Sequence, residues 1–288
     1  MRLASWRKDG AESYGVVRPD GTLVDLGNAL GPSCPDLKSL LAAGALDQAR
    51  RTAETAPSAG RVGEVQLLPP IPNPGRILCV GVNYPKRNAE YKDGSEAPRY
   101  PSLFVRFPAS LVGHEEPIER PPESTQFDYE GEVAMIIGKA GRRIPQARAQ
   151  EHIAALTLMN EGTLRDWVRH GKFNVTPGKN FERSGSAGPW AVTLDETGPI
   201  DGLTILTRVN GEEFQRGHTG TLSFSFAHII AYISTFMTLQ PGDVIATGTP
   251  PGTGGRRNPP VWLKAGDVVE IECAAIGVLR NRVVDEVV

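Results

Sequence analysis

Two glutamates stand two positions apart in an apolar segment of the sequence, Glu130 and Glu132. Because successive side chains of a β-strand point to opposite faces, a strand here places both carboxylates on one face. Val133, Met135 and Ile137 then point to the other face. Two neighbouring carboxylates repel each other, and a cation between them restores the charged form of both. The pattern indicates a metal site, with an edge strand that exposes an acidic face to solvent as the alternative.

The candidate ligands of this site are oxygen atoms only. No Cys or His accompanies the two glutamates in the spacing of a zinc site. Hard cations prefer carboxylate oxygens, whereas Zn²⁺ is bound mostly through Cys and His. The expected ion is therefore Mg²⁺ or Mn²⁺.

The composition favours a protein that acts on small molecules. The 288 residues include 31 Lys and Arg against 33 Asp and Glu, and the absence of a basic run argues against nucleic-acid binding. Cys34, Cys79 and Cys273 are far apart and form no CxxC pair, as expected of buried thiols in a reducing compartment. The N-terminus lacks the apolar core of a signal peptide, and no apolar run reaches the roughly 20 residues of a membrane span. We expect a cytoplasmic protein that does not bind a membrane.

The first part of the chain predicts a small separate domain. Two strands are expected around the turn at Asp20 and Gly21, followed by a helix over 36–51 that Gly44 interrupts. Four prolines lie between residues 68 and 75, and proline continues neither a helix nor a sheet. We therefore expect a small β-rich N-terminal domain over residues 1–70 and a catalytic domain over residues 71–288.

Strands dominate the remainder of the sequence. They are predicted over 77–82, 103–106, 129–137, 155–159, 203–209, 212–215, 243–247 and 268–274. Helices are predicted over 146–154, 163–170 and 225–239. Strands and helices do not alternate regularly and no phosphate-binding glycine motif occurs, which argues against a doubly wound sheet or an α/β barrel. The fold class is α+β and rich in β.

Several motifs follow one another in a fixed order. They are Ile77-Leu-Cys-Val-Gly-Val-Asn-Tyr84, Asp128-Tyr-Glu-Gly-Glu132, Asn160-Glu-Gly-Thr-Leu-Arg-Asp-Trp167, Gly178-Lys-Asn-Phe181, Gly188-Pro-Trp190, Val209-Asn-Gly-Glu212, Pro241-Gly-Asp-Val-Ile-Ala-Thr-Gly-Thr-Pro250 and Trp262-Leu-Lys-Ala-Gly-Asp267. In this order the chain resembles the fumarylacetoacetate hydrolase family, most strongly from residue 77 onward. The resemblance implies a mixed β-sandwich roll with a small N-terminal domain, a homodimer, and a divalent metal bound by three carboxylates. Family members cleave carbon-carbon bonds in acylpyruvates and fumarylacetoacetate, or decarboxylate and isomerise related oxo-diacids.

The resemblance supplies the metal ligands. The family's Glu-x-Glu ligands fall on Glu130 and Glu132. The third ligand is usually the aspartate that opens an Asp-x-Thr-Ala-Arg-Asp motif, and Glu161 stands at that place here. Because glutamate is one methylene longer, the ion is expected to lie slightly displaced or to be bound with a different denticity.

The resemblance also assigns residues around the metal. Lys179 matches a lysine that lines the pocket beside the ion, and Thr249 matches a threonine that contacts substrate. Arg165 and Asp166 keep the family's Arg-Asp pair. Asp166 is expected to contact substrate, with an ordinary ion pair within its own helix as the alternative. Lys179 and Arg165 are expected to neutralise a substrate carboxylate or a developing oxyanion.

The segment that ends at Glu90 departs from the family pattern. That pattern is Asn-Tyr-x-x-His-Ala-x-Glu, in which the histidine and the glutamate together activate water. Tyr84 and Glu90 are kept here, but Arg87 replaces the histidine, and an arginine cannot serve as a general base. Glu90 is then the expected base, with Arg87 and Tyr84 contacting substrate. His114 and His218 are candidate substitutes for the missing histidine, with plain surface histidines as the alternative.

Three functions are consistent with these residues. The first is a divalent-metal-dependent hydrolase that cleaves a carbon-carbon bond in a β-diketo or acylpyruvate-type acid through a metal-stabilised enolate. The second is an isomerase or decarboxylase acting on an oxo-diacid of the 2-hydroxyhepta-2,4-diene-1,7-dioate or oxaloacetate type, which needs no activated water. The third is a metal-binding protein that has lost turnover. The set of motifs favours the first function, and the missing histidine favours the second.

Overall fold

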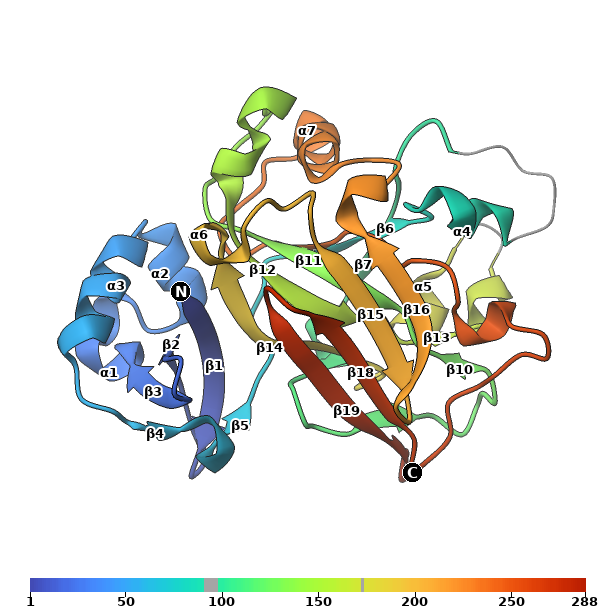
Figure 1. The fold of residues 1–288 in the computed structure, drawn as a ribbon, viewed down its shortest axis with the longest axis horizontal. Coiled ribbons are helices and arrows are strands. Elements are labelled where there is room, and N and C mark those ends of the chain that lie inside the picture. Colours follow the sequence, from blue (N-terminus) through green and yellow to red (C-terminus); the bar gives the residue numbers. More distant parts are fainter. Residues whose placement is uncertain (91–97, 172–173) are drawn as a thin grey trace.

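Two β-sheets and the helices around them form the structure, a computed structural model that describes residues 1–90, 98–171 and 174–288 (Figure 1). The larger sheet has twelve strands. Ten follow one another in the order β4 (Gly60–Arg61), β3 (Thr22–Asp25), β2 (Ala11–Val17), β1 (Arg2–Lys8), β14 (Gly185–Thr193), β12 (Ile153–Asn160), β11 (Gly131–Ile137), β17 (Val244–Ala246), β6 (Ile77–Gly81) and β7 (Ser102–Arg106). Two more pair at its side, β5 (Gln66–Leu67) with β1 and β8 (Leu111–Val112) with β14.

The smaller sheet has five strands and packs against the larger one (Figure 1). Its order is β16 (Glu212–His218), β15 (Thr204–Val209), β18 (Val268–Cys273), β19 (Gly277–Asp285) and β9 (Ile118–Arg120). A separate pair consists of β10 (Phe127–Asp128) and β13 (Thr163–Leu164). This arrangement confirms the predicted α+β, β-rich class and the mixed β-sandwich roll.

The N-terminal strands and helices lie together at one side of the molecule (Figure 1, blue). The predicted hairpin is present as β2 and β3, and Gly21 takes the positive φ of 81° that its turn needs. The predicted helix over 36–51 is two helices, because Gly44 with a φ of 63° separates them. The helices and turns here are α1 (Leu26–Leu30), η1 (Gly31–Ser33), α2 (Leu37–Ala42), α3 (Leu46–Thr55) and η2 (Val62–Glu64).

The two predicted domains share one sheet. Strand β1 pairs with β14 of the larger part, with Arg2 opposite Val192 and Leu3 opposite Ala191. The proposed boundary near residue 70 therefore separates two stretches of sequence without dividing the sheet.

Helices in the larger part are short, except for one. They are α4 (Pro85–Ala89), η3 (Pro108–Ser110), η4 (Gln146–His152), η5 (Trp167–Arg169), α5 (Thr176–Lys179), α6 (Leu194–Thr197), η6 (Thr219–Thr221), α7 (Phe226–Phe236) and η7 (Gly254–Arg256). Helix α7 confirms the helix predicted over 225–239 except at its last three residues, where Leu239 forms a β-bridge with Gly141. The side chain of Ser225 caps α7 by accepting a hydrogen bond from the backbone N of His228. Among the described residues, no helix has both the length and the apolar character that crossing a membrane requires.

The helix predicted over 163–170 was wrong for its first half. Residues 163–164 form β13, which pairs with β10, and only the turn η5 follows. The backbone N of Arg165 donates to the carbonyl oxygen of Gln126, so pairing with a distant segment overrides the local helical pattern. The predicted helix over 146–154 is the 3₁₀ turn η4, and strand β12 already begins at Ile153.

Strand β11 is buried on both faces and separates two hydrophobic cores. Val133, Met135 and Ile137 belong to the core between the two sheets and α7. Ala134 and Ile136 belong to the core between the larger sheet and the N-terminal elements. This alternation confirms the predicted side-chain directions and makes β11 a rigid support for the residues at its start.

Candidate active site

Three buried glutamates meet where β11 begins and β12 ends. Glu130 directly precedes β11, Glu132 is its second residue, and Glu161 follows β12. Antiparallel pairing sets Gly131 opposite Asn160, and the backbone N of Glu161 donates to the carbonyl oxygen of Glu130 at 2.8 Å. One carboxylate oxygen of each glutamate lies within 4.8 Å of the others. The residues are only 5%, 1% and 1% exposed, which rules out a solvated acidic edge strand.

The donor set of these glutamates fits a hard divalent cation. All the candidate ligand atoms are carboxylate oxygens, and Oε1 of Glu161 is buried without a hydrogen-bond partner among the described residues. Burial raises the pKa of Glu132 well above its ordinary value, and the charges of Glu161 and Glu130 raise it further. A bound divalent cation would offset this repulsion and supply the missing partner of Glu161.

Lys179 places an ammonium group between two of the three carboxylates. Helix α5 ends at this residue, and its Nζ donates to Oε2 of Glu130 at 2.7 Å and to Oε2 of Glu161 at 3.1 Å. Its Nζ also lies 5.1 Å from the ring centre of Phe104 in β7. Burial lowers the pKa of Lys179, but the two carboxylates raise it by more, so the amine stays protonated. It can therefore donate a hydrogen bond or stabilise an anion, but it cannot act as a base near neutral pH.

Arg165 bridges two carboxylates. Its Nε donates to Oδ2 of Asp128 at 2.7 Å, and its Nη2 donates to Oε1 of Glu130 at 2.5 Å. Although burial favours the neutral form of Glu130, Arg165 and then Lys179 hold its pKa below the usual range. Asp128 also accepts hydrogen bonds from the backbone N of Gly254 and Gly255. The guanidinium of Arg165 is therefore held in place by Asp128 and Glu130.

Arg87 lies between the predicted base, Glu90, and Glu130 of the three buried glutamates. It lies in α4 and is 3% exposed, and its Nη1 donates to Oε2 of Glu90 at 2.6 Å. Its Nη2 lies 3.5 Å from Oε1 of Glu130. The other oxygen of Glu90 accepts from the backbone N of Gly252 at 2.9 Å. The arginine that replaces the family histidine therefore occupies the site itself.

The remaining predicted residues divide into two groups. Thr249 lines the cavity at the glutamates, where its Oγ1 donates to the carbonyl oxygen of Gly131 and accepts from Gln215. Tyr84 is buried but does not line this cavity. Asp166 also lies outside the lining, and its Oδ1 accepts from Oγ of Ser124 at 2.6 Å and not from an arginine of its own segment. The substrate contacts expected of Tyr84 and Asp166 stay predictions.

The cavity above the glutamates has a volume of about 410 Å³. One end is polar and consists of the three glutamates with Thr249 and the three cations Arg87, Arg165 and Lys179. The apolar residues that line the cavity are Val80, Val82, Leu103, Phe104, Val105, Val168 and Val175. Glu90 is not among the lining residues, so its function as a base stays a prediction.

The two candidate histidines lie away from this cavity. Nδ1 of His114 accepts from the backbone N of Arg280, and burial lowers the pKa of this histidine. Nδ1 of His218 accepts from the backbone N of Gly220 at the start of η6. Neither ring lines the cavity, and no other histidine does so within the described part of the chain.

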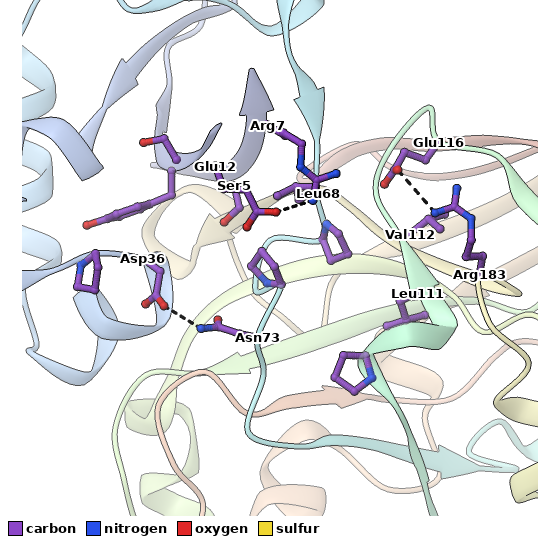
Figure 2. A pocket seen from close by; sticks show the side chains of 16 residues that line it. Ser5, Arg7, Glu12, Asp36, Leu68, Asn73, Leu111, Val112, Glu116 and Arg183 are labelled. Atoms are coloured by element: carbon purple, nitrogen blue, oxygen red, sulfur yellow. Dashed lines mark hydrogen bonds and ion pairs between the residues drawn. The ribbon is translucent and has the colours of Figure 1, made fainter. Parts of the chain in front are cut away.

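A second cavity of about 570 Å³ lies between the N-terminal elements and the larger part (Figure 2). Four of its charged side chains form ion pairs, Arg7 with Glu12 at 2.5 Å and Arg183 with Glu116 at 4.0 Å, and Asp36 accepts a hydrogen bond from Asn73. In the ranges that the structure describes, the glutamates at β11 are the only group of three His, Cys, Asp or Glu residues arranged to hold a metal. The candidate active site is therefore the smaller cavity.

One residue of the site escaped the sequence analysis. Arg106, at the end of β7, lies with Nη1 3.8 Å from Oε1 of Glu161 and is 2% exposed. The sequence did contain a signal for this residue, because Arg106 ends a strand that is mostly apolar. A charge buried with such a strand needs a partner of opposite charge or a set of hydrogen bonds.

The pKa shifts predict how stability depends on pH. Burial raises the folded-state pKa of Glu132 and Glu161 above the ordinary 4.5, so the folded protein binds more protons than the unfolded chain above that pH. These two groups should make the metal-free protein less stable as the pH rises from about 5 to about 7. Glu130 has a lowered pKa, so it makes the folded protein less stable only when the pH falls below 4.5. Mn²⁺ requires charged carboxylates, so the rise in Tm that it causes should grow over the same range. Thermal unfolding with EDTA or MnCl₂ measures both effects, and an equal metal effect at both ends of the range would contradict the prediction.

Comparisons with known proteins match this architecture. Residues 76–284 match the family model for the C-terminal domain of fumarylacetoacetate hydrolase. An oxaloacetate tautomerase of Xenopus laevis, named as mitochondrial, is 37% identical over 294 residues, which cover 99% of this chain and 90% of that protein.

Solved structures agree with the sequence matches. A fumarylacetoacetate hydrolase from Exiguobacterium antarcticum superposes with a TM-score of 0.84 at 33% identity, covering 99% of this chain and all of that one. A maleylpyruvate hydrolase from Sphingobium sp. SYK-6, in complex with manganese(II) and pyruvate, gives a TM-score of 0.81 at 25% identity, with both chains fully covered. The chain belongs to the fumarylacetoacetate hydrolase family of enzymes.

Proposed function

We propose that this protein is a divalent-metal-dependent tautomerase or isomerase of a small 2-oxo dicarboxylate of the oxaloacetate type. The observation that carries the proposal is Arg87. It stands where family members keep the histidine of the water-activating pair, and it is held by Glu90 and Glu130. No histidine is among the described residues that line the cavity, which favours a reaction that needs no activated water over hydrolysis. The tautomerase named among the relatives supports the same activity.

Tautomerisation needs a proton to move but no water. In the enol-to-keto direction the enol O–H bond breaks and a C–H bond forms at the neighbouring carbon. In the reverse direction that C–H bond breaks and the oxo oxygen is protonated, so neither direction needs an oxidant or co-reactant. Mg²⁺ or Mn²⁺ bound by Glu130, Glu132 and Glu161 would stabilise the negative charge of the enolate. Lys179, kept protonated by its neighbours, can donate to the developing oxyanion, and Arg165 can neutralise a substrate carboxylate.

Glu90 is the carboxylate best suited to take the proton. Asp128 already accepts hydrogen bonds from Arg165 and from the backbone N of Tyr129, Gly254 and Gly255, so its oxygens are saturated. Glu90 has a side chain that is 21% exposed and accepts from Arg87 and the backbone N of Gly252. A carboxylate with fewer fixed donors and access to solvent can exchange a proton with substrate more readily.

The test starts from enol-oxaloacetate. With Mg²⁺ or Mn²⁺ the protein should accelerate the loss of the enol ultraviolet band, and NMR in D₂O should show deuterium entering C3 without pyruvate appearing. Hydrolysis of acylpyruvates under the same conditions, with ketonisation no faster than in buffer, would overturn the proposal.

The cavity supports a second candidate function. Its volume of about 410 Å³ and its apolar lining of valines, Leu103 and Phe104 leave room for a larger substrate with an apolar arm. This favours a carbon-carbon bond hydrolase acting on an acylpyruvate. Identification of products by mass separates the two activities, because hydrolysis releases two acids and tautomerisation leaves the mass unchanged.

Arg87 should determine how the protein treats a dicarboxylate. Its guanidinium matches a carboxylate in two-point geometry, which a lysine cannot reproduce. We expect Arg87→Lys to raise the KM for oxaloacetate while hardly changing the KM of a substrate without the distal acid. Arg87→His should increase hydrolysis of simple acylpyruvates, since it restores the family's residue. Steady-state kinetics on both substrates measure these effects, and unchanged kinetics in both variants would remove position 87 from the site.

A homodimer is part of the proposal. Strand β7 is the outer strand of the larger sheet, and Val105 and Phe107 near its end are 41% and 53% exposed. Such an apolar edge suits contact with a second copy of the chain.

A further inference from the structure

Strand β7 carries two side chains that lie beside the Lys179 and Glu161 ion pair. Phe104 and Arg106 are two residues apart, so they point to the same face of the strand. Phe104 lies under the ammonium group of Lys179, and Arg106 lies beside Glu161. The outer strand of the sheet therefore contacts both members of the Lys179 and Glu161 ion pair.

The guanidinium of Arg106 is rigidly held. Nη1 donates to the carbonyl oxygen of Gly162 at 2.9 Å, Nε to Oγ of Ser110 at 3.1 Å, and Nη2 to Oγ of Ser184 at 3.2 Å. The side chain is fully buried. A buried arginine with this many fixed partners has a single position and a permanent charge.

Within the described part of the chain, the carboxylate nearest to the charge of Arg106 is that of Glu161. Its Oε2 accepts from Lys179, while its Oε1 has no hydrogen-bond partner among the described residues and lies 3.8 Å from Nη1 of Arg106. This separation is too long for a hydrogen bond but close enough for charge attraction. The lone pairs of Oε1 therefore stay available for a metal ion. Arg106 also binds the carbonyl oxygen of Gly162, the residue that follows Glu161.

We propose that Arg106 is a positioning residue that orients Glu161 as a metal ligand. Arg106 is not among the residues that line the cavity, but it lies 3.8 Å from Glu161, which does line it, so its effect passes through the carboxylate of Glu161. The inference rests on the metal site of the proposed function. Partners behind a ligand fix its orientation and usually change metal affinity by about 10- to 100-fold.

The test compares three substitutions at this position by Mn²⁺ titration calorimetry and by the electron paramagnetic resonance spectrum of bound Mn²⁺. Arg106→Met removes charge and hydrogen bonds, Arg106→Gln keeps hydrogen bonding without charge, and Arg106→Lys keeps the charge. We expect the first two to weaken Mn²⁺ binding by about 10- to 100-fold and to alter the spectrum at saturation, with Arg106→Lys recovering most of the loss.

Arg183→Met is the matched control. Arg183 donates to Glu119 at 2.6 Å, outside the metal site, and its loss should leave Mn²⁺ affinity unchanged. Melting temperatures establish which variants fold. If Arg106→Met does not fold, Arg106→Gln provides the test. A folded Arg106→Gln variant with parental affinity and spectrum would overturn the inference, as would an Arg106→Lys variant as weak as Arg106→Gln. Failure of the parent protein to bind Mn²⁺ would instead overturn the metal site itself.

Discussion

Replacing Glu132 by glutamine should abolish turnover and weaken Mg²⁺ or Mn²⁺ binding by at least about 100-fold. Substituting a residue that only hydrogen-bonds a metal ligand weakens binding by up to about 100-fold, so loss of the ligand itself should cost at least as much. Glutamine has the same shape as glutamate but lacks the charge that a hard cation needs. Glu130→Gln and Glu161→Gln should have the same effect, because the three carboxylates lie within 4.8 Å of one another and act as one site. Titration calorimetry with Mn²⁺ and the ketonisation assay measure the losses.

The same substitution should not destabilise the metal-free protein. Glu132 is 1% exposed and lies beside two other carboxylates, so its neutral replacement removes repulsion from the interior. In EDTA, Glu132→Gln should therefore melt at or above the parental Tm, and Mn²⁺ should raise only the parental Tm. Glu12→Gln, at an exposed glutamate paired with Arg7, is the control that should leave metal binding unchanged. Parental metal affinity in all three ligand variants would show that the site lies elsewhere.

Glu90→Gln should lower turnover by roughly two to four orders of magnitude, the usual contribution of general acid-base catalysis, while metal affinity stays near the parental value. The reason is that an amide can neither accept a proton from the substrate nor return one to it. Rapid kinetics on enol-oxaloacetate, with metal affinity measured in parallel, separate this loss from a loss of the metal.

The chain offers a close control for this substitution. Glu213 pairs with Arg216 three residues away, as Arg87 pairs with Glu90, but on the exposed strand β16. Glu213→Gln should therefore leave turnover unchanged. If instead Glu90→Gln is nearly normal and a His114 or His218 variant loses as much activity, the proton passes through that histidine and the assignment of Glu90 is incorrect.

The candidate metal site shows how much local sequence patterns can predict. Strand alternation predicted that Glu130 and Glu132 share a face, and the structure confirms this because alternation depends only on neighbouring residues. Glu161 was expected from the resemblance, and pairing of β11 with β12 brings it beside the other two. The helix predicted over 163–170 failed at the same place, since this segment pairs with residues 126–128 instead.

The family, the β-rich class and the acidic residues of the candidate metal site could be predicted from the sequence, because motifs and strand alternation depend on the types and spacing of residues that are near each other in the chain. Which cations contact these carboxylates could not be predicted in this way. Arg87, Arg106 and Lys179 come from α4, β7 and α5, and their charges converge on Glu130 and Glu161 only after distant strands pair. Tertiary structure also joined the N-terminal strands to the larger sheet through β1 and β14. Such contacts depend on packing between segments that are far apart in the sequence, and the spacing of apolar residues within one segment does not predict them.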